Sequence, residues 1–326
     1  MKDHISIILL LICLLLSAFS GCLDDENNGD DDDIPTSIPA PTWEPGKFWV
    51  YAFTTPDEID IATRMVVAQD DGTNHQVGTA NMDEAMRHAV LNYNPLLGRV
   101  ELNNFSVYEN GELQTLFQFP LTKDSSWSFS FLGVEGWEAR VESITRTTIP
   151  ATGSTIIVDI RATAPGGEVM DYSFDVAAGW VHLMRAYNVD GSTLVNMTLV
   201  SHGSGHTGEV YFIRARDLLD ESYSSPPPVV ELYDTFLDSG HPTDGDFDRL
   251  IIYLNIQAGG GSSGSLTLRD HSSAIGYNFI INEDSNGNHI DDIEDQSGEW
   301  TLEVNLEGST SVRIRIAGGI WNIWTV

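Results

Sequence analysis

From residue 46 onward, apolar residues mostly alternate with polar ones or occur in short runs. A period of two is typical of half-buried β-strands, because successive side chains of a strand point to opposite faces. Turn sequences such as Asp71-Gly72 and Asn110-Gly111 separate the runs. The pattern predicts strands at 48–53, 63–68, 127–131, 155–162, 169–176, 181–189, 194–200 and 210–215. We therefore expect antiparallel β structure in this part of the chain.

One stretch, Asn81 to Leu91, has a helical pattern instead. Asn81 is a suitable N-cap, because its side chain can accept hydrogen bonds from the first unpaired N–H groups of a helix. Glu84 follows three residues later, as in a capping box. We expect one short helix within an otherwise antiparallel β domain over residues 46–222.

Three consecutive prolines, Pro226 to Pro228, form the best domain boundary. Proline cannot donate to a β ladder and makes a stiff link. Beyond it, strands are expected at 250–256, 265–268, 277–281, 300–306, 311–316 and 320–326. So many strands in about 100 residues predict a β-sandwich over 226–326. The expected fold class is all-β: an open, half-barrel-like sheet with one short helix, and then a β-sandwich.

The first residues differ from the rest of the chain. Ile5 to Phe19 is almost entirely apolar, which suits a signal peptide and is shorter than the ~20 residues that span a bilayer. The stretch Phe19-Ser20-Gly21-Cys22 resembles the lipobox of prokaryotic lipoproteins, with Phe19 where leucine is usual. That resemblance implies a signal peptide over 1–21, cleavage before Cys22 and a diacylglyceryl group on the Cys22 thiol. An uncleaved anchor helix and an ordinary secretory signal are the alternatives.

The residues after Cys22 are expected to form a tether. Residues 24–33 hold seven acidic side chains, which repel one another and cannot build a core. Four prolines follow between Ile34 and Pro45 and stiffen the spacer. The only other cysteine, Cys13, lies inside the predicted signal peptide, so no disulfide is expected in the mature chain.

The formal net charge of −32 limits the classes of partner that this chain could bind. The chain has only 16 lysine and arginine residues and 48 acidic ones. This balance argues against nucleic acid, whose phosphates need a basic surface, and against lying flat on anionic headgroups. It fits a soluble chain in salty or calcium-containing surroundings. With the lipobox, it suggests an archaeal or marine source and a lipid anchor on the extracytoplasmic face of the cell membrane.

The strongest candidate site is an acidic segment near the C-terminus. Its oxygen ligands would be Asp284, Asn286, Asn288, the backbone carbonyl of Ile290, Asp292 and Asp295. Hard oxygen donors at alternate positions are how a loop surrounds Ca²⁺. The segment resembles the calcium loops of dockerins and thrombospondin type 3 repeats, which implies calcium as a cofactor. His289 stands where glycine is usual, and Asp295 stands where an EF-hand has glutamate. An ion-free polar hairpin is the alternative.

A second acidic cluster precedes the strand predicted at 250–256. Asp244, Asp246 and Asp248 alternate with Gly245 and Phe247. Carboxylates this close together repel one another unless a cation lies between them. The cluster is either part of the calcium site or a solvated turn.

Motifs within residues 120–200 resemble another family. They are Pro120-Leu121, Trp127, the stretch Thr148-Ile149-Pro150-Ala151-Thr152-Gly153, Asp171-Tyr172-Ser173-Phe174 and Gly179-Trp180-Val181. This order resembles the lipoprotein-like β domains of the DUF3108/TapB kind. The resemblance implies the open half-barrel of lipoprotein carriers, and it implies no established chemistry.

No catalytic residue is predicted. His202 and His206 have a zinc-like spacing, but glycines around them indicate a loop rather than a helix face. The sequons at Asn104 and Asn196 are candidate N-glycosylation sites in an exported chain.

These observations predict a membrane-anchored lipoprotein with a non-catalytic binding or structural role and a calcium-stabilised C-terminal domain. Its partners would be the membrane, through the lipid, and a surface protein or a carbohydrate. One alternative is a secreted hydrolase or its carbohydrate-binding accessory, which a pair of acids in a cleft would favour. Another is a carrier of lipids or envelope components, which requires a deep apolar groove in the first domain.

Overall fold

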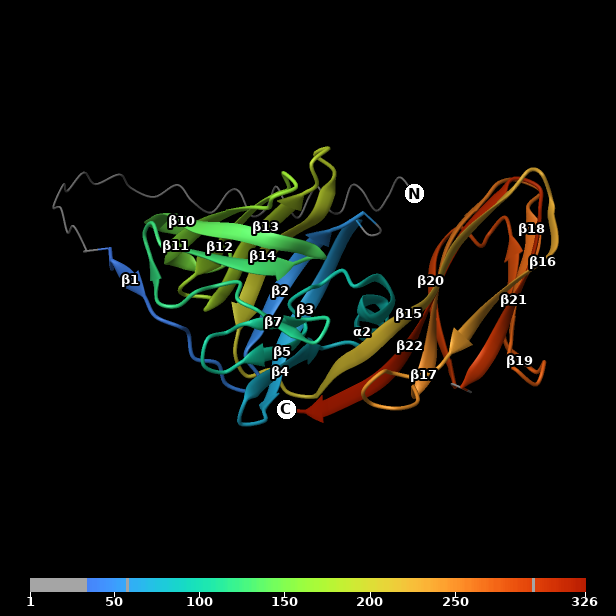
Figure 1. Ribbon diagram of the computed structural model, residues 1–326, viewed down its shortest axis with the longest axis horizontal. Helices are drawn as coiled ribbons and strands as arrows, with labels where there is room; N and C mark the ends of the chain where they lie inside the picture. The colour runs from blue at the N-terminus through green and yellow to red at the C-terminus, as the bar shows by residue number, and fades with distance from the viewer. Residues whose placement is uncertain (1–33, 57–58, 295–296) are drawn as a thin grey trace, which may run out of the picture. The chain divides into compact units, whose positions relative to one another are not determined.

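Antiparallel strands make up most of the chain that the structure describes (Figure 1). The computed structural model describes residues 34–56, 59–294 and 297–326. The predicted signal peptide, the lipidation site Cys22, the acidic stretch 24–33 and the calcium ligand Asp295 lie outside these residues. Ile34 to Val326 form one compact unit.

One large sheet of sixteen strands organises this unit. Its strands are β2 (Phe48–Thr54), β3 (Ile59–Asp70), β4 (Asn74–Thr79), β5 (Gly98–Glu101), β6 (Val107–Glu109), β7 (Glu112–Gln114), β9 (Ser126–Phe131), β10 (Val134–Ile149), β11 (Gly153–Thr163), β12 (Val169–Asp175), β13 (Trp180–Tyr187), β14 (Thr193–Gly203), β15 (Glu209–Ser225), β17 (Arg249–Ala258), β20 (Gly287–Glu294) and β22 (Thr310–Thr325). The main path runs β20-β17-β22-β15-β4-β3-β2-β14-β13-β12-β11-β10-β9, so the sheet is open at both ends. A two-residue strand β1 (Ser37–Ile38) pairs separately with β8 (Leu121–Thr122).

The N-terminal part of the large sheet encloses an aromatic core. Trp49, Tyr51 and Phe53 alternate toward the interior along β2, as a period of two requires. Trp43 precedes this strand and lies among the rings of Trp49, Phe105 and Trp180, with centroid distances of 4.6–4.8 Å. Its Nε1 donates to the Gly179 carbonyl at 2.9 Å. The chain therefore becomes part of the core soon after the predicted tether.

The predicted helix is α2 (Met82–Leu91), and Asn81 is its N-cap. The Asn81 Oδ1 atom accepts hydrogen bonds from the N–H groups of Asp83 and Glu84 at 2.8 and 3.4 Å. The Glu84 carboxylate, however, is hydrogen-bonded to the backbone of Arg64. The helix packs against β15, β17 and β22.

A second sheet completes a β-sandwich in the C-terminal part of the chain. It contains β16 (Val229–Asp238), β18 (Ser263–Arg269), β19 (Ile275–Asn282) and β21 (Gly298–Glu307), in the order β16-β21-β18-β19. Its inner face packs on β15, β17 and β22 around a second core that includes Trp300, Leu302 and Leu254. The all-β prediction, with one short helix and a C-terminal sandwich, is confirmed.

The two parts of the chain share one sheet. Strand β15 begins inside the predicted first domain, and it pairs with the C-terminal strand β22 from Glu209↔Thr325 to Ser225↔Thr310. Strand β17 is buried on both faces: Leu250 and Leu254 face the second core, and Ile251 and Tyr253 belong to the first. Pro226–Pro228 separate β15 from β16. The domain boundary at 222–226 stays a prediction.

Several elements differ from the expected ones. Strands 311–316 and 320–326 are one strand, β22, and the glycine-rich segment 259–264 connects the two sheets. Strands β10, β16 and β20 were not predicted, nor were the shorter strands β1, β4, β5, β6, β7 and β8. Residues 287–294, expected to form most of a calcium loop, are strand β20, which pairs with β17.

Candidate functional site

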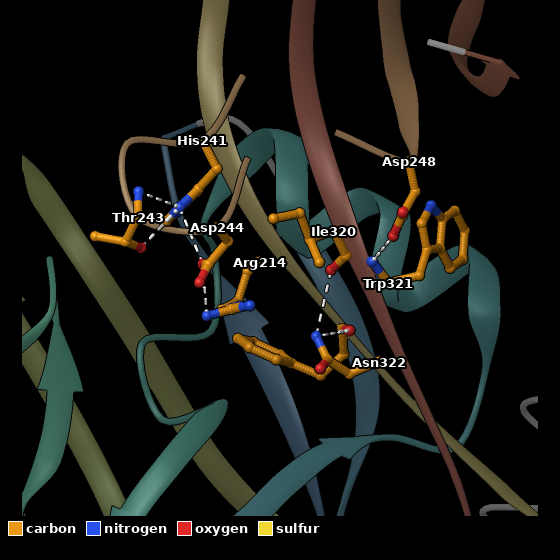
Figure 2. A network of polar contacts seen from close by, with 9 residues as sticks. Arg214, His241, Thr243, Asp244, Asp248, Ile320, Trp321 and Asn322 are labelled. Atoms are coloured by element: carbon orange, nitrogen blue, oxygen red, sulfur yellow. Dashed lines mark hydrogen bonds and ion pairs between the residues drawn. The ribbon is translucent and has the colours of Figure 1, made fainter. Parts of the chain in front are cut away.

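The acidic cluster before β17 lies in a loop that is held against β15 and β22 (Figure 2). Asp244 Oδ2 lies 2.7 Å from Arg214 Nη1 of β15 and 3.0 Å from His241 Nδ1. Asp248 Oδ2 accepts a hydrogen bond from the Trp321 N–H of β22 at 2.8 Å. Asp246 is exposed. Two of the three predicted carboxylates thus already have protein partners, and these partners offset the repulsion that suggested a cation.

Figure 2 also shows the arrangement around His241. Thr243 Oγ1 lies 3.1 Å from His241 Nδ1, the same ring nitrogen that Asp244 contacts. A catalytic triad needs its nucleophile and its acid on different ring nitrogens, so that the imidazole can pass a proton between them. Because both groups meet Nδ1 here, this cluster has the geometry of a structural contact and not of a proton relay.

The loop is also closed by packing. Phe247 is buried over Gly318 of β22, where a Cβ atom would lie 2.2 Å from the Phe247 ring. The backbone of Asp248 donates to the Gly319 carbonyl at 2.9 Å. Asp248 is therefore fixed relative to β22 by the neighbouring ring and by hydrogen bonds, whereas Asp244 is held to Arg214 of β15.

The structure spreads the predicted calcium ligands along strand β20 and the turn before it. The Asn286 side chain binds the backbone of Ala258, Asn288 Oδ1 accepts from Asn255 at 2.8 Å, and Asp292 forms an ion pair with Arg249. Asn288, Ile290 and Asp292 share one face of the strand, where alternate residues lie about 6.8 Å apart. Asp284 lies in the turn, and Asp295 is outside the described residues.

Within residues 34–56, 59–294 and 297–326, no group of three or more His, Cys, Asp or Glu side chains is gathered as a metal site. The acidic loop 244–248 and the 284–294 segment do not form one common cluster of this kind. Calcium binding stays a prediction.

A different pocket gathers carboxylates on the outer face of the large sheet. It has a volume of about 300 Å³, and its lining includes Glu142 of β10, Asp159 and Arg161 of β11, and Asp171 of β12. Asp159 accepts a hydrogen bond from the Ser143 hydroxyl at 2.6 Å, and Arg161 pairs with Asp171 at 3.2 Å. Glu142 and Asp159 are exposed.

Ser262 was missed as a candidate by the sequence reasoning, although Gly260-Gly261-Ser262-Ser263-Gly264 has the G-x-S-x-G spacing of a nucleophile elbow. In that motif the serine stands exposed on a turn from a strand to a helix. Here Ser262 is buried on the connection from β17 to β18, and its Oγ donates to the Ser309 carbonyl at 2.8 Å. The structural context therefore indicates a turn-stabilising serine.

The two histidines with zinc-like spacing lie in different environments. His202 is on β14 beside β2, and His206 follows in the loop, where its N–H donates to the Gly46 carbonyl at 3.0 Å. Burial is the largest cause that lowers the pKa of each imidazole. Each is thereby held toward its neutral form.

The predicted glycosylation sites also differ in accessibility. Asn104 is exposed in a turn, and its Oδ1 accepts from the Ser106 N–H at 2.8 Å. Asn196 lies within strand β14, half-buried, with a buried Oδ1 atom. Asn104 is the more accessible of the two.

Aromatic side chains fill the first core of the described residues. Large rings fill it, each less than 2% exposed: Trp49, Trp137, Trp180, Tyr51, Tyr93, Tyr172, Phe53, Phe117, Phe131 and Phe174. Trp321 and Trp324 of β22 are half-buried on opposite sides of the strand, against the first core and a small cluster around Val66. Both rings are thus partly covered by neighbouring side chains.

Among the residues that the structure describes, no helix is both long and apolar enough to cross a membrane.

No family model matches the sequence, and no curated protein matches it. Among solved structures, the chain is similar to a glycoside hydrolase family 43 arabinoxylan arabinofuranohydrolase from Bacillus subtilis in complex with cellotetraose. The identity is 10%, the match covers 81% of this chain and 64% of that one, and the TM-score is 0.19. This chain thus spans less than two thirds of that structure. A TM-score this low does not show a shared fold.

Proposed function

We propose that this chain is a lipid-anchored protein of the extracytoplasmic face of a cell membrane, with a non-catalytic binding role. The lipobox-like stretch that ends at Cys22 supports the anchor. Two observations support the binding role. Aromatic rings fill the first core, and contacts of Asp244 and Asp248 hold the acidic loop in place. Recognition is therefore left to the exposed surfaces of the β layers.

A carrier of lipids or envelope components is the less favoured role. Such a protein needs an apolar cavity of several hundred Å³ to remove its cargo from water. The fully buried Trp49, Trp137 and Trp180 occupy the interior where that cavity would lie. Binding at the outer surface requires no such space.

A secreted hydrolase is the second candidate, and one observation favours it: Glu142 and Asp159 line the same pocket. A glycosidase usually keeps its acid protonated by burial next to an apolar group. Both carboxylates are exposed, and Asp159 already accepts a hydrogen bond from the Ser143 hydroxyl. Replacing Glu142 and Asp159 by amides should leave any hydrolysis of polysaccharides or glycosides unchanged, and a complete loss of such an activity would establish the hydrolase instead.

Calcium stabilisation of the C-terminal sandwich remains part of the proposal. Because Asn286, Asn288 and Asp292 have protein partners, calcium would have to replace their contacts with Ala258, Asn255 and Arg249. Scanning calorimetry in EDTA and in millimolar Ca²⁺ tests this. A rise in the melting temperature with calcium supports it, and an unchanged melting temperature up to ~10 mM Ca²⁺ removes it.

Cell fractionation tests the anchored location most simply. The full chain expressed in a prokaryotic host should be found in the membrane fraction, and protease added to intact, wall-free cells should digest it. Cys22→Ser lacks the thiol that the lipid needs and should be released or retained as precursor, because one covalent lipid signal holds the chain. Membrane association equal to that of the natural chain in a Cys22→Ser variant that has lost residues 1–21, or protection from protease, contradicts the proposal.

A further inference from the structure

Strand β16 forms an edge of the four-stranded sheet. It pairs with β21 on one side, from Leu232↔Val304 to Asp238↔Gly298 without irregularity. Within the described parts of the chain, no strand pairs with its other side. A regular stretch of backbone N–H and C=O groups is therefore open to another strand.

Exposed apolar side chains are concentrated on this strand. Thirteen large hydrophobic residues are exposed in the described chain, and four of them lie within residues 230–237. They are Val230 (66% exposed), Leu232 (40%), Tyr233 (54%) and Leu237 (67%). Tyr233 and Leu237 face outward, since the residues between them in the alternation, such as Phe236, face the core. Apolar groups clustered in this way mark an interaction site more often than single exposed residues do.

Proteins usually protect such an edge with lysine, proline, inward-pointing charges or a very short strand. Strand β16 has ten residues and contains neither lysine, arginine nor proline. Its inward-facing charges are Asp234 and Asp238. A bulge occurs only at its beginning, between Val229 and Leu232. From Leu232 onward, the strand has the regular geometry that strand addition needs.

The charges around β16 select the partner. Glu231 is exposed next to the bulge, and Glu299 and Glu303 of β21 lie directly opposite Leu237 and Tyr233. The whole chain carries a net charge of −32. A second copy would bring the same acids and the same net charge, and it is disfavoured by their repulsion. A segment that combines apolar and cationic side chains is attracted instead.

We propose that β16 is a docking strand that accepts an extended, lysine- or arginine-containing apolar segment of a partner protein by β-strand addition. Backbone hydrogen bonds along Leu232–Asp238 supply the pairing, and Tyr233 and Leu237 supply apolar contacts on the outer face. The long cationic side chains reach the exposed Glu299 of β21, whereas Glu303 already pairs with Arg269 of β18. This inference rests on the proposed binding role and gives it a surface and a partner chemistry.

Peptide binding to the full chain in detergent micelles tests the inference. The probe is a fluorescent ten-residue peptide of alternating lysine and valine, which matches the length of β16. A second peptide of the same charge has proline at two central positions and cannot form a strand. Fluorescence anisotropy at ~0.15 M salt should show saturable binding of the first peptide and at least about tenfold weaker binding of the second. Equal binding of both peptides, or no saturable binding, overturns the proposal.

Two charge-matched double variants locate the site. Tyr233→Lys with Leu237→Lys should weaken binding about tenfold or more, because the apolar contacts are lost and cations repel the probe. Ile275→Lys with Ile280→Lys, at the other edge strand β19, adds the same charge at side chains that are 58% and 61% exposed. It should bind nearly as the natural chain does, and equal weakening in both variants overturns the assignment to β16. All four side chains are exposed, and the melting temperature of each variant is measured to check that it folds.

Sedimentation equilibrium without peptide tests whether a second copy of this chain binds to β16 instead. A dimer that Leu237→Lys dissociates would make a second copy the partner and would overturn the proposal, whereas a monomer agrees with it. The result is separate from the anchoring test. If peptide binding fails while Cys22 still determines membrane association, only the docking strand is wrong.

Discussion

The side-chain amide of Asn286 binds both backbone polar groups of Ala258. Its Oδ1 accepts from the Ala258 N–H at 2.6 Å, and its Nδ2 donates to the Ala258 carbonyl at 2.8 Å. Ala258 ends β17, and the ladder between β17 and β20 begins at the next inward pair, Ile256↔Gly287. Asn286 therefore extends this ladder with its side chain.

This contact predicts the effect of Asn286→Ala. Three hydrogen bonds are lost near the surface, two to Ala258 and one to the Glu283 carbonyl, so the free energy of unfolding should fall by ~1–2 kcal/mol in EDTA. Urea denaturation of the full chain measures this loss. The control is Asn103→Ala in an exposed turn, whose free energy of unfolding should stay within ~0.5 kcal/mol of that of the natural chain. A loss that appears only when calcium is present would assign Asn286 to an ion instead of to Ala258.

Gly318→Ala should destabilise the acidic loop. The new Cβ would lie 2.2 Å from the Phe247 ring, so the ring must leave its place. We expect a loss of ~1–3 kcal/mol in thermal or urea unfolding. Gly260→Ala is the matched control, because nothing lies within 4 Å of its Cβ. If Gly318→Ala and Phe247→Ala have fully additive effects, the close approach is not the cause.

Alternation of apolar residues predicts strands well where one face is buried over several residues. Strand β2 was predicted in this way from the alternation of Trp49, Tyr51 and Phe53. Strand β10 was missed because only Trp137, Ala139 and Val141 alternate inward, and a mostly exposed, charged and threonine-rich stretch follows. The pairing of β15 with β22 depends on residues about one hundred positions apart, which local patterns do not encode.

The candidate sites show a similar limit. Oxygen-rich spacing around Asn286 and Asp292 predicts metal ligands, but it equally suits side chains that complete an edge strand. The deciding groups, Ala258 and Arg249, come from another strand. The proposal for β16 likewise depends on its position at the edge of a sheet. Only the sheet order shows this position.

Trp43→Ala should be among the most destabilising single changes. It removes a buried ring that packs on Trp49, Phe105 and Trp180, together with a hydrogen bond to Gly179. A large-to-small change of this kind costs ~3–5 kcal/mol, measurable by urea unfolding. Trp43→Phe keeps most of the packing and should cost clearly less. A loss below ~1 kcal/mol for the alanine variant would mean that Trp43 is not part of the core in solution.

His88 should make the protein acid-sensitive. Burial lowers the pKa of His88 from 6.5 to about 4. The unfolded chain therefore binds this proton more readily, and the stabilisation is complete above pH 6.5 and is lost as the pH falls toward 4. A shift of this size corresponds to about 3 kcal/mol. Urea unfolding between pH 7 and 4 should show a smaller decline in a His88→Gln variant, and parallel curves would contradict the assignment.

Glu84 acts in the opposite direction over the same pH range. Burial raises the pKa of Glu84 to about 7, so the folded state holds this proton more tightly than the unfolded chain. Its contribution is present below pH 4.5 and is lost as the pH rises through 7. A Glu84→Gln variant should therefore lose less stability than the natural chain between pH 5 and 7. The same urea series measures it, and identical slopes would exclude this role.

Intact-mass spectrometry of the mature protein, purified from a prokaryotic membrane fraction, shows whether Cys22 is the first residue and carries the lipid. We expect a chain that begins at Cys22 and carries the additional mass of a diacylglyceryl group, which Cys22→Ser abolishes. A mature chain that retains residues 1–21, or one that begins elsewhere without lipid, would contradict this expectation.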